Sequence, residues 1–452
     1  MVDYIIVFIY LIGILIYGFV SSKKITSLKD FALSDRRYGS FVIFATLSAS
    51  FIGGGFSFGN ASKVYFSGIG YSIALLGFSL KEILTGKFLS PYMKTHHDVI
   101  STGGIIEKSF GKEAKLFTGI LSIILCGGML GAQVGAMGYI FEAMVGLGKA
   151  WGILLGCAIV VFYSTSGGMK AVIATDIVQF IILFIGIPLT LIFGVINAGG
   201  VEKIISTVPV THFDPLNESS IFGFIGLFLT FMLGEALIPP YTQRMLIAKD
   251  TRSLKKATIL SGVVSIPFFI ISGLLGIVSL SLFPSIDATT ALPMVVKTLP
   301  IVMAGFVISG LISVVMSSAD SILNSASVAI VEDVIDVISP QKNHSQKAKL
   351  KFARFSNIIT AVIAIIVAML IPNLLDILML FYIIWAPAML IPIILAIKGY
   401  AGSKRQFFAM SFTGIVSALL IYIFLKPPFT SSYLVISIIL SLIVFLMSKS
   451  HT

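Results

Sequence analysis

Long apolar runs alternate with short polar connections along the whole chain. Each run extends for roughly 20 residues, which is the length that a helix needs to cross a hydrocarbon core of about 30 Å. The pattern therefore predicts an all-α polytopic membrane protein with about 13 transmembrane helices. The expected spans are Tyr4–Val20, Phe41–Val64, Gly70–Leu89, Leu116–Met144, Trp151–Ser164, Val172–Ile196, Ile221–Met245, Ala257–Phe283, Ile301–Val331, Phe352–Ile371, Leu374–Ile397, Phe407–Leu425 and Ser432–Met447.

Two of these spans contain residues that interrupt a helix. The second span carries the glycines Gly53–Gly55, and the seventh carries Pro239 and Pro240. Proline removes a backbone donor, and each glycine costs ~1 kcal/mol relative to alanine. Non-helical backbone at membrane depth is tolerated where it lines a cavity or is buried in protein. The breaks lie five spans apart in two sets that enter from opposite sides, which predicts an inverted five-helix repeat around a central site.

This repeat divides the chain into four expected parts. Residues 1–40 hold the first transmembrane helix and a cytoplasmic loop, and residues 404–452 hold two C-terminal helices. The first five-helix repeat is expected over residues 41–197, and the second, inverted repeat over residues 219–398.

Basic residues are concentrated in alternate connections. Of the 31 Lys and Arg residues, 25 lie in the connections after odd-numbered spans, at the adjoining span ends or in the C-terminal tail, and five lie in the connections after even-numbered spans or at the adjoining span ends. The positive-inside rule therefore predicts an N-terminus outside the cell and a C-terminus in the cytoplasm, as an odd number of spans requires. The short loops favour a multi-pass protein of a bacterial inner membrane.

Composition excludes several other classes. The chain is 57% hydrophobic and 11% charged, against about 25% charged in soluble proteins, so its net charge of +11 indicates cytoplasmic loops rather than nucleic-acid binding. The sequence has no Walker motif, which argues against ATP drive. No expected span contains a histidine, so we expect no catalytic residues and no enzyme. A continuous polar stripe, as in a channel, is not seen, and the oligomeric state stays open.

One polar stretch lies where an apolar one would be expected. Met316–Ser325 follows the apolar run Ile301–Val315 and contains Asp320 among four serines. A charge at bilayer depth costs about 2.5–3.5 kcal/mol even on lenient scales, so it is kept there when it is paired, hydrated or functional. Hydroxyl, carboxylate and carbonyl oxygens are the ligands of hard cations. The stretch therefore predicts half of a cation site, with the broken second span as the other half.

Three motifs in order resemble the sodium:solute symporter family, which includes sodium-coupled sugar, proline, pantothenate and sialic acid carriers. They are the turn Tyr163–Ala171, the Thr175–Gln179 segment and the serine-rich Ser317–Ser325 segment. The resemblance covers roughly the second to the eleventh span. It implies a leucine-transporter-like fold and a coupling sodium ion that is not a tightly bound cofactor.

The resemblance also implies the ligands of that sodium ion. Ser317 and Ser318 match its two hydroxyl ligands, and Val314 matches a backbone carbonyl ligand one turn earlier. Ile43 and Thr46 match the partner carbonyls from the broken second span.

A second cation site is implied by two further matches, Asp176 and Ser321, which hold an additional sodium ion in some relatives. Asp320 departs from the family, and it could strengthen this site, carry a proton, or pair with Lys or Arg from the cytoplasmic loops. Gln243 and Arg244 end the seventh span, where we expect them to cap or gate the cytoplasmic face.

Substrate candidates surround the two breaks. Glu235 lies beside Gly234 and is open to three roles: binding a cationic group of the substrate, holding a proton, or accepting hydrogen bonds from freed backbone amides. The other candidates are Ala49, Ser50, Gly53, Gly54, Ser72 and Phe231. The sugar-carrier pattern is not kept, because Ala49 lacks a polar side chain and Phe231 replaces an asparagine.

The sequence thus predicts a secondary active transporter that carries sodium and a small organic solute into the cell by alternating access. The alternative is a proton-coupled symporter that uses Asp176, Asp320 or Glu235. The solute stays open among proline or another amino acid, a monocarboxylate and pantothenate, and Glu235 favours a solute with an amine or many hydroxyls.

Overall fold

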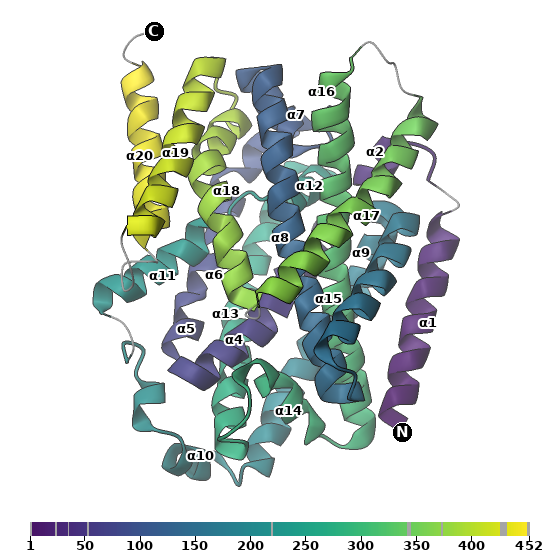
Figure 1. Ribbon diagram of the computed structural model, residues 1–452, viewed down its shortest axis with the longest axis vertical. Helices are drawn as coiled ribbons and strands as arrows, with labels where there is room; N and C mark the ends of the chain where they lie inside the picture. The colour runs from purple at the N-terminus through teal and green to yellow at the C-terminus, as the bar shows by residue number, and fades with distance from the viewer. Residues whose placement is uncertain are drawn as a thin grey trace.

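A computed structural model describes residues 2–22, 25–34, 36–51, 54–217, 220–340, 345–371, 374–424 and 432–449. The described residues form helices that run mostly along one axis, with α1 beginning at one end and α20 finishing at the other (Figure 1). The helices are α1 (Val2–Ser22), α2 (Leu28–Leu33), α3 (Ser40–Phe51), α4 (Gly54–Ser67), α5 (Gly70–Ala74), α6 (Leu76–Phe88), α7 (Thr102–Phe110), α8 (Lys112–Val145), α9 (Lys149–Asn197), α10 (Val201–Thr207), α11 (Ile221–Leu233), α12 (Pro239–Leu246), α13 (Thr251–Leu282), α14 (Ala291–Lys297), α15 (Ile301–Val328), α16 (Asp336–Ile338), α17 (Gln346–Leu370), α18 (Leu374–Ile397), α19 (Lys404–Phe424) and α20 (Ser432–Lys449).

Each expected span is found as a helix or as a pair of helices. Seven described helical segments are long and apolar enough to cross a membrane, and four shorter apolar helices accompany them. The second span is described as α3 and α4, and the seventh is α11 followed by α12, so the break expected in the seventh span is confirmed. Residues 52–53 of the first break lie outside the described residues.

The fifth and sixth spans are joined within α9 at a glycine turn. Gly168 has φ 53° and ψ −169°, a conformation that L side chains rarely adopt. A Cβ atom at this position would lie 2.9 Å from Ile25 and 3.0 Å from Phe31. The turn therefore needs glycine both for its backbone angles and for its contact with the segment after α1.

Helix α15 lies at the centre of the bundle. It packs against α1, α8, α9 and α3, and every residue from Val307 to Val328 is buried. The hydroxyl and carboxyl groups of this helix therefore face protein rather than lipid, which meets the condition for polar groups at membrane depth.

The outer surface is apolar. Phe8 on α1 is 63% exposed, Phe162 on α9 is 60% exposed and Phe355 on α17 is 61% exposed. Apolar exposure on several outer helices is unusual for a soluble protein and is the surface that a bilayer covers.

Candidate functional site

Four helices bring their polar residues together around Asp176, which lies on α9 and is fully buried. Its Oδ2 accepts a hydrogen bond from Thr46 Oγ1 of α3, and its Oδ1 accepts one from Ser317 Oγ of α15. Arg244 Nη2 of α12 lies 3.4 Å from Oδ2. Both carboxylate oxygens are therefore paired inside the protein, as a buried charge requires. We refer to Thr46, Asp176, Arg244, Ser317 and Ser321 as the ion cluster.

Arg244 lies inside this cluster. Its side chain is 1% exposed, its Nε donates to Thr46 Oγ1 at 3.0 Å, and its Nη2 also donates to Ser321 Oγ. The sequence placed Arg244 at the cytoplasmic end of its span as a cap or gate. The structure places its guanidinium among residues assigned to cation binding, and the expected role as a cap or gate stays a prediction.

All five residues assigned to the main sodium ion are buried where α3 faces α15. Ile43 and Thr46 lie one turn apart on α3, and Val314, Ser317 and Ser318 lie on α15. Ser318 also lines a central cavity, so this group of oxygens adjoins it.

Asp320 is fully buried on α15. The hydroxyl of Ser164 lies 3.5 Å from its backbone carbonyl oxygen, and its carboxylate acts electrostatically on the guanidinium of Arg244. Of the three roles left open for Asp320, this proximity favours a partnership with arginine, although the arginine comes from α12 rather than from a cytoplasmic loop.

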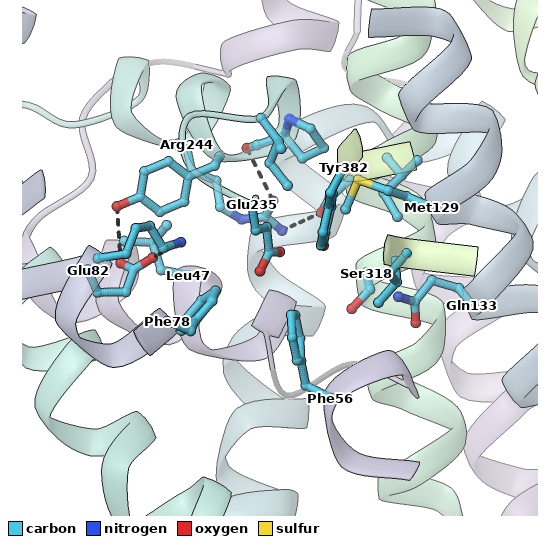
Figure 2. A pocket seen from close by; sticks show the side chains of 17 residues that line it. Leu47, Phe56, Phe78, Glu82, Met129, Gln133, Glu235, Arg244, Ser318 and Tyr382 are labelled. Atoms are coloured by element: carbon cyan, nitrogen blue, oxygen red, sulfur yellow. Dashed lines mark hydrogen bonds and ion pairs between the residues drawn. The ribbon is translucent and has the colours of Figure 1, made fainter. Parts of the chain in front are cut away.

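The central cavity lies between α3, α4, α6, α8, α12, α15 and α18 (Figure 2). Aromatic rings form much of its wall. They belong to Phe56, Phe78, Tyr241 and Tyr382. The charged residues that line it are Lys81, Glu82, Glu235 and Arg244.

Two of the cavity's charges are paired with each other. Lys81 Nζ lies 2.7 Å from Glu82 Oε1 and 3.8 Å from the ring centre of Phe78. Tyr241 Oη donates to Glu82 Oε2 at 3.0 Å. This arrangement neutralises Lys81 and Glu82, and leaves Glu235 as the cavity's other acid.

Glu235 is the polar residue that most clearly lacks a protein partner. Its side chain is 8% exposed, and its Oε2 has no hydrogen-bond partner within the described part of the chain. In Figure 2 its carboxylate points into the space bordered by Phe56, Phe78 and Tyr382. The hydroxyl of Tyr382 likewise has no partner among the described residues. Buried polar atoms are normally paired, so such groups beside a cavity indicate a missing ligand.

The helix break explains why Glu235 reaches the cavity. Helix α11 ends at Leu233 and α12 begins at Pro239, and Leu237 between them has φ 56°. A branched residue with positive φ is strained by about 1–3 kcal/mol, a cost that is retained mainly at functional sites. At Gly234, a Cβ atom would lie 2.7 Å from the Thr230 carbonyl and 3.2 Å from the ring of Tyr382.

Among the described residues, the remaining substrate candidates are not part of the cavity wall. Ala49 is buried on α3, and Phe231 packs behind Phe56 with ring centres 6.3 Å apart. Ser72 donates to the carbonyl of Phe269 at 2.7 Å. The backbone of Gly54 begins α4. Gly53 and the side chain of Ser50 lie outside the described residues.

Sequence reasoning missed several residues of the site. Neither Lys81 nor its neighbour Glu82 is among the residues that the sequence assigned to the site. Adjacent opposite charges within an apolar run were a signal that could have identified the pair. The aromatic residues Phe56, Phe78, Tyr241 and Tyr382 carried no such signal, because aromatic side chains are common throughout the spans.

Comparisons with known proteins identify a family for this chain. A family model described as the sodium:solute symporter family matches residues 31–399. "Sodium/proline symporter 2" of Staphylococcus saprophyticus is 26% identical over 81% of this chain and 75% of its own length. "High-affinity choline transporter 1" of Drosophila melanogaster is 27% identical over 82% of this chain and 62% of its own length.

The fold also matches a solved structure. A substrate-bound, outward-open Na⁺-coupled sialic acid symporter superposes with a TM-score of 0.87 over 100% of this chain and 98% of that chain, at 20% identity. The expected leucine-transporter-like fold is therefore confirmed.

Proposed function

The chain belongs to the sodium:solute symporter family, and on this premise we propose that it imports a small solute that carries a cationic nitrogen. As a member of this family it is a multi-pass membrane transporter in which sodium is the coupling ion. The alternative of proton coupling is accordingly not retained. What the proposal adds is the class of solute and the residues that bind it and the ion.

The observation that carries the proposal is the Glu235 carboxylate in the central cavity, whose Oε2 has no hydrogen-bond partner among the described residues. Lys81 and Glu82 compensate each other, so the carboxylate of Glu235 makes this part of the cavity negative. A buried charge without a partner is unfavourable, and a cationic ligand would remove that cost.

The aromatic wall supports the same class of solute. Cations are attracted to the faces of aromatic rings, and aromatic cages recognise substituted ammonium groups. Phe56, Phe78 and Tyr382 border the space into which Glu235 points (Figure 2). The two relatives described above are named for proline and choline, which share a positively charged nitrogen and differ in most other respects. Solutes whose only charge is a carboxylate, such as pantothenate, fit the cavity poorly.

The sodium ion would bind where α3 faces α15. We assign it to the hydroxyls of Ser317 and Ser318 and to the carbonyls of Ile43, Thr46 and Val314. Neutral oxygens hold sodium weakly enough to release it. An ion that joins the broken span to α15 stabilises one conformation, and the solute prefers that conformation, which couples the two by differential affinity.

The second cation site is assigned to Asp176, Asp320 and Ser321. The substrate site comprises Glu235 and Gly234 at one break, with Gly53, Gly54, Ala49, Ser50, Ser72 and Phe231 as surrounding positions. We further propose that the N-terminus lies outside the cell, that the C-terminus is cytoplasmic, and that residues 41–197 and 219–398 are the two repeats.

Uptake into proteoliposomes tests the class of solute. Under an inward sodium gradient, unlabelled proline, glycine betaine or choline should compete for uptake of a labelled cationic-nitrogen solute, while pantothenate and pyruvate should not. The Glu235→Gln variant should lose this uptake, whereas Glu113→Gln, at an exposed site paired with Lys404, should retain it. Uptake of a simple carboxylate that survives in Glu235→Gln would contradict the proposal.

A further inference from the structure

Arg244 contacts the residues assigned to cation binding, although it is itself a cation. Its guanidinium donates to Thr46 and Ser321 and pairs with Asp176 at 3.4 Å. A fourth contact is made to the Pro240 carbonyl at 3.4 Å, so its donors are directed to several oxygens at once. The guanidinium therefore uses the kind of oxygen ligands that a sodium ion would use.

A guanidinium and a sodium ion cannot share this position. Asp176 Oδ2 already accepts hydrogen bonds from Thr46 and Arg244, and Ser321 Oγ already accepts one from Arg244. A second monovalent cation beside these oxygens would also be repelled by the guanidinium, because charges buried in protein are screened less than charges in water.

The charges of the buried cluster indicate how many mobile cations it accepts. Asp176 and Asp320 contribute two negative charges, and Arg244 contributes one positive charge, and all three side chains are buried. One sodium ion at Ser317 and Ser318 would make the group neutral. Two sodium ions would leave an uncompensated positive charge inside the bundle, which is unfavourable.

We propose that Arg244 is the built-in second cation of this transporter, so that one sodium ion accompanies each solute molecule. The inference rests on the proposed sodium site. In this arrangement the carboxylate of Asp320 provides the second negative charge of the buried cluster, and it interacts electrostatically with the Arg244 guanidinium. Removing the charge of Arg244 would then open the place at Asp176 and Ser321 to a second sodium ion.

The test measures sodium stoichiometry in the wild type and in Arg244→Gln. Glutamine removes the positive charge but keeps hydrogen-bond donors. Arg252→Gln is the matched control, because Arg252 is an exposed arginine at the start of α13. The number of bound ions is taken from the rise of apparent stability with ln[Na⁺] in purified protein, and the number transported from the solute accumulation ratio in proteoliposomes at fixed sodium gradients.

The expected numbers are one ion for the wild type and for Arg252→Gln, and two for Arg244→Gln. Adding Asp320→Asn to Arg244→Gln should return the number to one, because the surplus negative charge is then gone. Two ions in the wild type, or one ion in folded Arg244→Gln, would overturn the inference. If Arg244→Gln does not fold, the stoichiometry of the wild type decides, and one ion supports the inference while two overturn it. No sodium effect in the wild type would instead refute the sodium site itself.

Discussion

The ion cluster and the central cavity are neighbours with opposite hydrogen-bonding states. In the ion cluster, both oxygens of Asp176 accept hydrogen bonds from protein side chains, and Arg244 provides the counter-charge. In the cavity, Glu235 Oε2 and the Tyr382 hydroxyl have no partner among the described residues.

The difference separates two kinds of buried polar group. Polar residues of the cluster stabilise the packing of α3, α9, α12 and α15 whether or not a ligand is bound. In the cavity, the burial of Glu235 Oε2 and the Tyr382 hydroxyl without hydrogen-bond partners is unfavourable until a ligand binds. Substitutions should therefore affect stability in the first region and ligand binding in the second.

The largest expected effect follows from Asp176→Ala. This change leaves the buried guanidinium of Arg244 without its carboxylate, which should lower the free energy of unfolding by about 3–5 kcal/mol. Thermal unfolding of the purified protein without sodium or solute measures it. Asp376→Ala is the control, because Asp376 is 58% exposed and pairs with Lys63 at the surface, where an ion pair contributes less than about 1 kcal/mol. Equal effects of the two changes would contradict a structural role for the cluster.

Removal of the two hydroxyls assigned to sodium should have the second largest effect on stability. Ser317→Ala combined with Ser318→Ala should abolish the sodium-dependent rise in stability, which amounts to about 2.7 kcal/mol when sodium is present at 100 times its Kd. Ser437→Ala with Ser441→Ala provides a matched pair of buried serines on α20, away from the site. A normal sodium response in the first double variant would refute the assignment.

A substitution in the cavity should change solute affinity rather than the free energy of unfolding. Glu235→Gln should weaken binding of a cationic-nitrogen solute by about 10- to 150-fold, because a hydrogen bond to a charged group contributes about 1.5–3 kcal/mol. The free energy of unfolding without ligand should not fall, since the wild-type carboxylate lacks a partner. Calorimetric titration and thermal unfolding of the same preparation measure both quantities. A loss of stability similar to that of Asp176→Ala would remove the contrast between the regions.

The smallest expected effect is at Gly234. A Cβ atom at this position would press on the ring of Tyr382, so Gly234→Ala should reduce solute affinity by about 5-fold, which corresponds to an overpacking cost of ~1 kcal/mol. Sodium binding should persist. Gly13→Ala is the control, because a Cβ atom at Gly13 would meet nothing within 4 Å. Unchanged solute affinity in Gly234→Ala would place the solute away from Tyr382.

The apolar runs were sufficient to predict the spans, and the two prolines were sufficient to predict the break between α11 and α12. The number of residues in an apolar run shows directly whether a helix can cross the membrane. Gly53–Gly55 and Pro239-Pro240 disfavour a helix wherever they occur. The encounter of Asp176 with Ser317 across 141 positions was within reach only through a family resemblance, since nothing local in either segment specifies the other.

Other parts of the site could not be predicted because they depend on the direction of side chains after a break. Arg244 was assigned to the cytoplasmic face from its position at the end of a span. Its guanidinium contacts Asp176, and α12 follows a turn in which Leu237 has a positive φ. The pairing of Lys81 with Glu82 depends similarly on how α6 faces α12, which the hydrophobic pattern of α6 does not determine.

The central claim is sodium-coupled binding of a solute that has a cationic nitrogen. The most direct test measures the thermal stability of the purified wild-type protein in sodium and in potassium, with proline, choline, glycine betaine, pantothenate and pyruvate added in turn. We predict a rise that is specific to sodium, and a further rise with a solute that has a cationic nitrogen only when sodium is present. Stabilisation by a simple carboxylate alone, or by any solute equally in sodium and potassium, would contradict it.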